Sequence, residues 1–213
     1  MPRVGVCDYG VGNLRSVERA LRVAGAEPVI SGDPDVIAGC DGVVLPGVGA
    51  FSVAAATLRD TGLGAAVREL ARQERPVLGV CLGHQLLFEG SDEGHGGEGL
   101  ALLRGRVVAL AAGGGLKVPH MGWNTITLVR DSPLLEGVTS GSFMYFVHSY
   151  VAVPEPSDTV AVTEYGIEMA VAVQRGTLMG TQFHPEKSGA AGLRVYANLV
   201  SLCAARIPAQ RAG

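Results

Sequence analysis

Cys81 is the residue of this sequence best placed for covalent chemistry. It lies in Pro76–Phe88, PVLGVCLGHQLLF, where an apolar strand pattern leads to the cysteine and a helix pattern follows it. Gly79 and Gly83 flank the turn, an arrangement typical of a nucleophile elbow with sulfur replacing a serine oxygen. The positive end of the helix dipole favours the nucleophilic thiolate there. Free backbone N–H groups at the turn, including that of Leu82, are expected to bind an oxyanion.

The alternative interpretation of Cys81 is a buried small side chain without a chemical role, which is common for free cysteines. The elbow context favours the nucleophile, whereas Cys7, Cys40 and Cys203 lack that context and keep the structural interpretation. The four cysteines form no C-x-x-C pair. This favours a reduced, cytoplasmic protein over a disulfide scaffold or a zinc module.

A cysteine nucleophile needs a proton acceptor, and His184 in GTLMGTQFHPEKS is the strongest candidate. It follows an apolar strand, which places it at the carboxyl edge of a sheet. Glu186 lies two residues further on, and in an extended segment both side chains point to the same side. Glu186 would then orient the imidazole of a Cys–His–Glu set. Taken alone, the H-P-E motif is better explained by a core histidine and a solvated carboxylate than by a catalytic pair. The catalytic interpretation is favoured because Cys81 independently needs a base.

Alternating strand and helix signals characterise the first half of the chain. Leu14, Val17 and Leu21 recur at helical spacing after the first apolar run. Such alternation builds a parallel sheet with helices on both faces. The strands expected in this half are residues 3–8, 27–31, 41–46 and 76–80.

Short strand signals dominate the second half and indicate a mixed or antiparallel extension of the sheet. Residues 91–99 are expected to form a mobile surface loop, and a last helix is expected over about 189–205 with Ser188 as its N-cap. The expected strands are residues 101–110, 124–130, 143–153, 159–164, 169–174 and 177–183.

Composition bounds the class of protein. The 213 residues are 47% hydrophobic and 17% charged, enough apolar matter for the core of one domain spanning residues 1–213. The net charge of −3 offers no basic field for nucleic acid or an anionic membrane. No apolar run is long enough for a membrane helix. Asp92, Glu93, His95 and Glu98 are better explained as a solvated loop than as a metal site.

The motifs GVCLGHQ and FHPE closely resemble those of the triad-type, class I glutamine amidotransferases. The resemblance implies a γ-glutamyl thioester on Cys81, release of ammonia with a proton from His184, and hydrolysis to glutamate. Five further motifs look like the glutaminase subunit of imidazole glycerol phosphate synthase and together span nearly the whole chain. They are DYGVGNLRSV, LPGVGAF, KVPHMGWN, YFVHSY and TQFHPEKS.

Several expectations follow from this resemblance. The fold is expected to be α/β, a flavodoxin-like, mostly parallel sheet flanked by helices with an added mixed or antiparallel strand region. The chain would be a glutaminase without cofactor or metal, part of a lyase-type synthase complex in histidine biosynthesis. Its partner would be a separate barrel-shaped cyclase subunit in a heterodimer. The cyclase would use the ammonia to make imidazole glycerol phosphate and an aminoimidazole carboxamide ribotide.

The resemblance also implies roles for matched residues. One departure is His84, where the family often has methionine. As a histidine near the nucleophile it competes with His184 for the role of base, but its place within the helix directs it elsewhere. The implied oxyanion residues are Gly47, Val48, Gly49 and Leu82; the implied glutamine-binding residues are Gln85, His148, Ser149 and Tyr150; and the implied cyclase-facing residues are Asn13, Pro119, Met121, Trp123 and Lys187.

Two rival functions remain. A related amidotransferase of another pathway, such as anthranilate synthesis, is disfavoured by KVPHMGWN and DYGVGNL. A non-catalytic assembly subunit with the same fold is disfavoured by the intact Cys81, His184 and Glu186 set.

Overall fold

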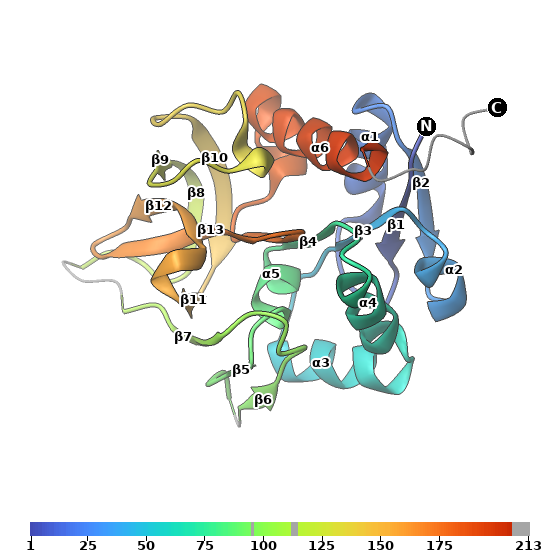
Figure 1. Ribbon diagram of the computed structural model, residues 1–213. Coiled ribbons are helices and arrows are strands. Elements are labelled where there is room, and N and C mark those ends of the chain that lie inside the picture. Colours follow the sequence, from blue (N-terminus) through green and yellow to red (C-terminus); the bar gives the residue numbers. More distant parts are fainter. Residues whose placement is uncertain (95, 112–114, 206–213) are drawn as a thin grey trace.

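The computed structural model describes residues 1–94, 96–111 and 115–205, and within them an eight-stranded sheet forms the centre of the fold (Figure 1). Its first five strands pair in parallel and the remaining three are antiparallel. The flavodoxin-like sheet with an antiparallel extension, expected from the sequence, is therefore confirmed. In spatial order the strands are β2 (Glu27–Ser31), β1 (Arg3–Cys7), β3 (Gly42–Leu45), β4 (Val77–Val80), β14 (Leu178–Thr181), β13 (Glu168–Arg175), β12 (Thr159–Glu164) and β9 (Thr127–Leu128).

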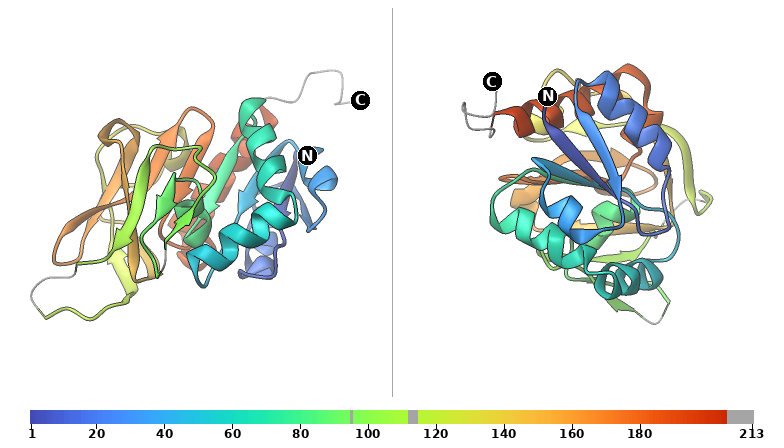
Figure 2. Two further views of the ribbon diagram at one scale, coloured as in Figure 1. Left: turned by 90° about the horizontal axis from the view of Figure 1, so that it is seen from below. Right: turned by 90° about the vertical axis from the view of Figure 1, so that its right-hand side faces the viewer.

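Helices cover both faces of the parallel strands (Figures 1 and 2). Neighbouring side chains of a strand point to opposite faces, so Val44 packs in one core while Val43 and Leu45 pack in the other. The first core is closed by α1 (Leu14–Val23) and α6 (Gly189–Ala204). Four helices close the second core: α2 (Pro34–Ala38), α3 (Phe51–Asp60), α4 (Leu63–Arg72) and α5 (Leu82–Leu86).

Two smaller sheets lie beside the antiparallel strands. In one, β8 (His120–Thr125) pairs antiparallel with β10 (Phe143–His148). In the other, the order is β11 (Tyr150–Pro154), β7 (Gly105–Ala109), β5 (Gly90–Ser91) and β6 (Gly97–Glu98). Short 3-10 turns complete the connections: η1 (Pro133–Leu135), η2 (Pro156–Asp158) and η3 (Pro185–Lys187). Among the described residues, no helix is both long enough and apolar enough to cross a membrane.

The structure corrects two strands expected from the sequence and adds a helix. The apolar run 143–153 is two strands in different sheets that part at Ser149, so the chain turns there toward the site. The expected strand 124–130 begins earlier, because His120–Thr125 pairs with β10, and only Thr127–Leu128 continues it as β9. The helix α2 was not expected, although Asp33 caps it by accepting from Asp35 N–H at 2.9 Å.

Residues 91–99 are also more ordered than the sequence indicates, as far as they are described. The strands β5 and β6 pair across them, and the Glu93 carboxylate accepts a 2.9 Å hydrogen bond from Phe51 N–H at the start of α3. His95, considered with this loop, lies outside the described residues.

Ser188 does not cap α6 with its side chain as expected. Its hydroxyl donates to the His184 carbonyl at 2.6 Å and accepts from Tyr145 N–H at 3.0 Å. These bonds tie the turn after β14 to β10. Ser188 therefore positions His184 rather than the helix.

The turn between β4 and α5 is possible only because its glycines lack side chains. A Cβ on Gly83 would lie 1.7 Å from the Leu45 carbonyl oxygen, and one on Gly79 would lie 2.5 Å from the Gly83 oxygen. Both collisions are with backbone, which cannot rotate away. Strand β3 and the start of α5 therefore lie in direct backbone contact.

Gly83→Ala should consequently destabilise the fold by about 3 kcal/mol or more, measured as the free energy of unfolding in urea. Gly39→Ala is the matched control, because its Cβ would meet its nearest atom at an ordinary 3.5 Å. The control should change stability by less than about 0.5 kcal/mol. Equal stabilities of the two variants would contradict the close contact.

Candidate active site

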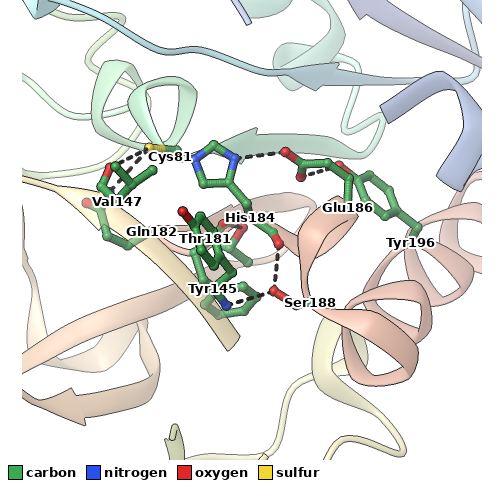
Figure 3. Close-up of polar contacts among 10 residues, drawn as sticks. Cys81, Tyr145, Val147, Thr181, Gln182, His184, Glu186, Ser188 and Tyr196 are labelled. Carbon is green, nitrogen blue, oxygen red and sulfur yellow. Dashed lines mark hydrogen bonds and ion pairs between the residues drawn. The ribbon is translucent and has the colours of Figure 1, made fainter. Parts of the chain in front are cut away.

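Cys81 stands between β4 and α5 in a backbone conformation that side chains rarely adopt, with φ 55° and ψ −111°. Its N–H donates to the Thr181 carbonyl at 2.8 Å, so β14 holds the turn in place. The residue is 6% exposed. The expected elbow is thus formed, with the sulfur at its apex (Figure 3).

The structure brings the His184 imidazole to this sulfur and places Glu186 on the far side of the ring (Figure 3). His184 Nδ1 lies 2.8 Å from Glu186 Oε1, and Tyr196 donates its hydroxyl to the other carboxylate oxygen at 3.4 Å. The opposite ring nitrogen, Nε2, faces Cys81 and has no hydrogen bond of regular geometry within the described chain (Figure 3). Glu186 reaches the ring from the 3-10 turn η3, not from an extended segment as the sequence argument assumed.

The surroundings of His184 favour its protonated form. Burial lowers the pKa of His184, but its contacts with Cys81 and Glu186 outweigh burial and raise the pKa from 6.5 to about 9. An imidazolium beside the sulfur can stabilise a thiolate and deliver a proton to a leaving group.

The other three cysteines stay in the core. Cys7, Cys40 and Cys203 are fully buried and form no disulfide. Burial raises the pKa of Cys7 and that of Cys203 to about 12. Each thiol therefore stays protonated and unreactive at neutral pH.

The glycine-rich segment after β3 lies against the elbow. Buried Tyr9 donates its hydroxyl to the Pro46 carbonyl and so anchors the start of the segment. The Leu82 N–H, expected to bind an oxyanion, donates instead to the Gly47 carbonyl at a long 3.4 Å. Val48 and Gly49 face the pocket, Val48 being 42% exposed.

A pocket of about 340 Å³ opens beside the sulfur. Its wall includes seven of the residues expected from the sequence: Val48, Gly49, Leu82, Gln85, His148, Ser149 and Tyr150. Of the remaining expected oxyanion residues, Gly47 lies behind the wall, where a Cβ would collide with the Tyr9 hydroxyl at 2.6 Å. Pro119, expected to face a partner, also lines the pocket.

Three residues at the site were missed from the sequence. Glu93 lines the pocket and offers a carboxylate suited to an amino group. Val147 lines it too, and its carbonyl accepts from the Cys81 thiol at 3.8 Å. Gln182 is fully buried, and its amide N–H points at the sulfur at 3.8 Å. The one feature of the sequence that could have identified Gln182 as a site residue is its position two residues before His184.

His84 does not compete with His184. It is fully buried, its ring packs edge-on against Phe88, and a Cβ on Gly180 would lie 2.2 Å from its Nδ1. Burial lowers the pKa of His84 to about 3, so the ring is neutral. The ring thus fills the space between α5 and β14.

The residues expected to face a partner lie on the surface. Met121 and Trp123 on β8 are 62% and 56% exposed. Trp123 packs edge-on against Tyr145 across the strand pair, and Lys187 Nζ lies 5.4 Å from the centre of the Tyr145 ring. Asn13 is exposed at the start of α1. Within the described ranges no group of three metal-ligating side chains is present.

Comparison with known proteins agrees with this geometry. Residues 5–200 match the family glutamine amidotransferase class-I. The chain belongs to this family. A relative from Methanosarcina mazei, imidazole glycerol phosphate synthase subunit HisH, is 49% identical over 95% of this amidotransferase and 100% of its own length. A protein of the same name from Moorella thermoacetica is 50% identical over 95% of this chain and 96% of its own.

Solved structures resemble this amidotransferase in fold. The crystal structure of a glutamine amidotransferase superposes with a TM-score of 0.75 at 20% identity, covering 94% of this chain and 98% of the other. PurLQS from Thermotoga maritima gives a TM-score of 0.73 at 20% identity, with 94% and 98% covered.

The raised pKa of His184 predicts how stability depends on pH. The folded-state value of about 9 lies above the ordinary 6.5, so this group stabilises the fold fully below pH 6.5 and loses that effect as pH rises through 9. Glu186→Gln removes a charge that raises the pKa, so the pKa of His184 should fall. The wild type should then lose more stability than the variant between about pH 7 and pH 10.

Histidine NMR gives the pKa directly, and urea unfolding at both pH values gives the stability. Glu155→Gln, a change to another carboxylate of this chain, is the matched control and should leave the pKa of His184 unchanged. An unchanged pKa in Glu186→Gln would contradict the electrostatic role of Glu186.

Proposed function

We propose that this chain is the glutaminase subunit of an imidazole glycerol phosphate synthase, and that residues 1–213 act as one amidotransferase domain. The observation that carries the proposal is the contact of Cys81 with His184, whose far nitrogen is held by Glu186 at 2.8 Å. The family match and the HisH relatives at about half identity support glutamine hydrolysis for histidine biosynthesis. No cofactor enters the proposed chemistry.

The proposed reaction begins when the Cys81 thiolate attacks the side-chain amide carbon of glutamine. The carbonyl π pair moves to oxygen, and the tetrahedral intermediate collapses as the C–N bond breaks. His184 gives its proton to the leaving nitrogen, so ammonia departs and a thioester remains. Water then adds to the thioester, giving its proton to His184, and glutamate leaves as the thiolate re-forms.

The oxyanion requires N–H donors, and in this structure one expected donor is already hydrogen-bonded within the protein. The Leu82 N–H is engaged by the Gly47 carbonyl at 3.4 Å. Rotation of the peptide between Gly47 and Val48 would remove that carbonyl and turn the Val48 N–H toward the pocket. One flip would thus free one donor and supply another. The missing Cβ of Gly47 supports such a motion.

Glutamine would bind in the pocket lined by Gln85, His148, Ser149 and Tyr150. Ser149 separates β10 from β11 and lines this pocket, and its carbonyl is held by the Leu110 N–H at 2.9 Å, which fixes this part of the wall. Glu93 also lines the pocket, and the carboxylate oxygen that does not accept from Phe51 N–H would take the α-amino group.

A cyclase subunit is the proposed partner, forming a cytoplasmic heterodimer with this chain. The outward side chains of β8 and β10 form an aromatic face of Met121, Trp123, Phe143 and Tyr145. Val147 belongs to the same strand and lines the pocket, so the face borders the site. Asn13, Pro119 and Lys187 complete the proposed interface. Exposed aromatic side chains of this kind are typical anchors of protein interfaces.

The first rival function, an amidotransferase for anthranilate synthesis, would keep the same site chemistry. The names and near-complete coverage of the relatives favour the synthase subunit. The second, a non-catalytic assembly subunit, leaves the strained backbone of Cys81 and the buried His184–Glu186 pair without a purpose.

Cys81→Ala should abolish glutamine-dependent synthesis by the reconstituted complex, by about a thousandfold or more, because the thioester cannot form. Synthesis from added ammonium salt should continue at the wild-type rate, since the cyclase performs that step. Cys203→Ala is the matched control and should keep glutamine-dependent synthesis. Loss of both activities in Cys81→Ala would contradict the proposed division of labour.

Glutaminase activity of the isolated chain should be low and should rise about a hundredfold or more when the cyclase subunit and its nucleotide ligand are added. The reason is the Leu82 N–H, which is held by Gly47 in the structure of the chain alone. Glutamate release is the measurement. Full turnover without the partner would refute a closed oxyanion site.

Trp123→Ala should weaken binding to the cyclase subunit about tenfold or more, because it removes the largest side chain of the aromatic face. Isothermal titration gives the Kd. Val23→Ala, at the far end of α1 from Asn13 and 68% exposed, is the control and should bind normally. Equal affinities would place the cyclase elsewhere.

A further inference from the structure

Two buried histidines, His148 in the pocket wall and its neighbour His120, make a hydrogen-bonded pair that takes no part in the proposed bond-making steps. His120 Nδ1 lies 3.0 Å from His148 Nε2, and His148 Nδ1 lies 3.0 Å from the Tyr150 carbonyl oxygen. His120 is 3% exposed and is sandwiched between the rings of Phe146 and Tyr165 at 4.7 Å and 4.1 Å. A simple core histidine has no need of such an aligned partner.

The Tyr150 carbonyl determines which ring nitrogen carries the proton in both His148 and His120. A carbonyl only accepts, so His148 must carry its proton on Nδ1 and leave Nε2 bare. His120 must then donate from Nδ1, which leaves its own Nε2 bare. The Asn124 amide nitrogen lies 3.3 Å from that atom and can donate to it.

The orientation of the Asn124 amide and the neutral charge of both imidazole rings agree with this assignment of the protons. Asn124 Oδ1 accepts from Thr125 N–H at 2.8 Å, which fixes the amide with its nitrogen toward His120. Burial lowers the pKa of His148 to about 4 and also lowers that of His120, so both rings are neutral. A neutral imidazole has one proton, and each ring uses its proton in the same direction along the chain.

The same carbonyl orders the residues on the side of the nucleophile. Gln85 Nε2 donates to the Tyr150 oxygen and to Gln182 Oε1, each at 3.0 Å. Because Gln182 accepts with its oxygen, its amide N–H must point the other way, toward the Cys81 sulfur at 3.8 Å. One acceptor therefore orients donors on both of its sides.

We propose that one hydrogen-bond network, centred on the Tyr150 carbonyl, aims an N–H donor at the Cys81 sulfur and fixes the pocket wall at residues 149–150. His120 and Gln182 are the positioning residues at its two ends. His120 precedes Met121 on β8, with the His120 side chain buried and that of Met121 exposed, so β8 links the network to the aromatic face. The kinetic part rests on the glutaminase function proposed above.

The first test needs no activity. Nitrogen-15 NMR of the histidine rings in the full chain should show both His120 and His148 in the Nδ1–H tautomer at neutral pH, assigned with His120→Phe and His148→Phe. In His120→Phe the stacking ring remains but the donor is lost, so His148 should keep its proton on Nδ1, where the Tyr150 carbonyl still accepts it, while the nitrogen-15 resonance of its bare Nε2 shifts as that atom loses its hydrogen bond. An Nε2–H tautomer for either histidine in the wild type would overturn the network.

The second test is glutaminase kinetics in the complex with the cyclase subunit and its nucleotide ligand. His120→Phe should raise the KM for glutamine about tenfold with a smaller change in kcat, because the pocket wall loosens. His120→Asn, whose amide nitrogen replaces Nδ1 as donor, should recover most of the loss. Equal defects in both variants would reduce His120 to a packing residue and overturn its assignment.

Thr163→Val is the matched control. The Thr163 hydroxyl donates to the Thr125 carbonyl of β8 at 2.6 Å, so this variant also loses one buried hydrogen bond to β8, but not one of the network. It should leave KM and kcat unchanged; a KM increase equal to that of His120→Phe would overturn the proposal.

Gln182 is tested at the sulfur itself. Gln182→Glu keeps the acceptor for Gln85 but replaces the donor facing Cys81 with a negative charge. Alkylation of Cys81 by iodoacetamide in the chain alone should slow about tenfold or more. An unchanged rate would remove Gln182 from the network. If instead wild-type turnover survives Cys81→Ala, the proposed function fails while the tautomer result stands by itself.

Discussion

The backbone contact between strand β3 and the first turn of α5 is the constraint on which the site depends. Gly83 lies so close to the Leu45 carbonyl that no side chain fits between them, and a Cβ on Gly79 would also collide with the Gly83 carbonyl. This contact forces the chain to reverse direction within one residue. That residue is Cys81, which accepts a positive φ so that its sulfur stands clear of both elements. The start of α5 is placed against the end of β3 by this contact, and the Cys81 N–H ties the turn to β14 through the Thr181 carbonyl at 2.8 Å.

Two other parts of the chain then support the nucleophile. The turn after β14 brings His184 and Gln182, and the break between β10 and β11 brings Val147, His148 and the Tyr150 carbonyl. Ser188 joins these two parts, because its hydroxyl bonds to both His184 and Tyr145. The nucleophile thus follows β4 of the central sheet, His184 follows its parallel neighbour β14, and the remaining support comes from β10 and β11 of the two smaller sheets. Such support from rigid elements keeps reacting groups in register.

The sequence was most informative where a local rule acts. Alternating apolar runs predicted the parallel strands, and the small residues around Cys81 predicted the elbow, because both depend on neighbours in the chain. Ser188 shows where local rules fail: its type fits a helix cap, but a nearer carbonyl took its hydroxyl. The split of 143–153 into two strands was hidden, because an unbroken apolar run carries no mark of a change of sheet. Glu93 reaches the site only through long-range packing, which no spacing rule describes, and for Gln182 the two-residue step to His184 was the only signal.

The positive φ of Cys81 has an evolutionary consequence. A glycine at this position would adopt the same backbone without steric cost, about 1–3 kcal/mol less strained than any residue with a Cβ. The fold would therefore gain from giving up its sulfur, and only selection for turnover opposes that drift. Among descendants of such a chain, a side chain retained at the bend would distinguish lineages that still use it from those in which the fold survives as a scaffold.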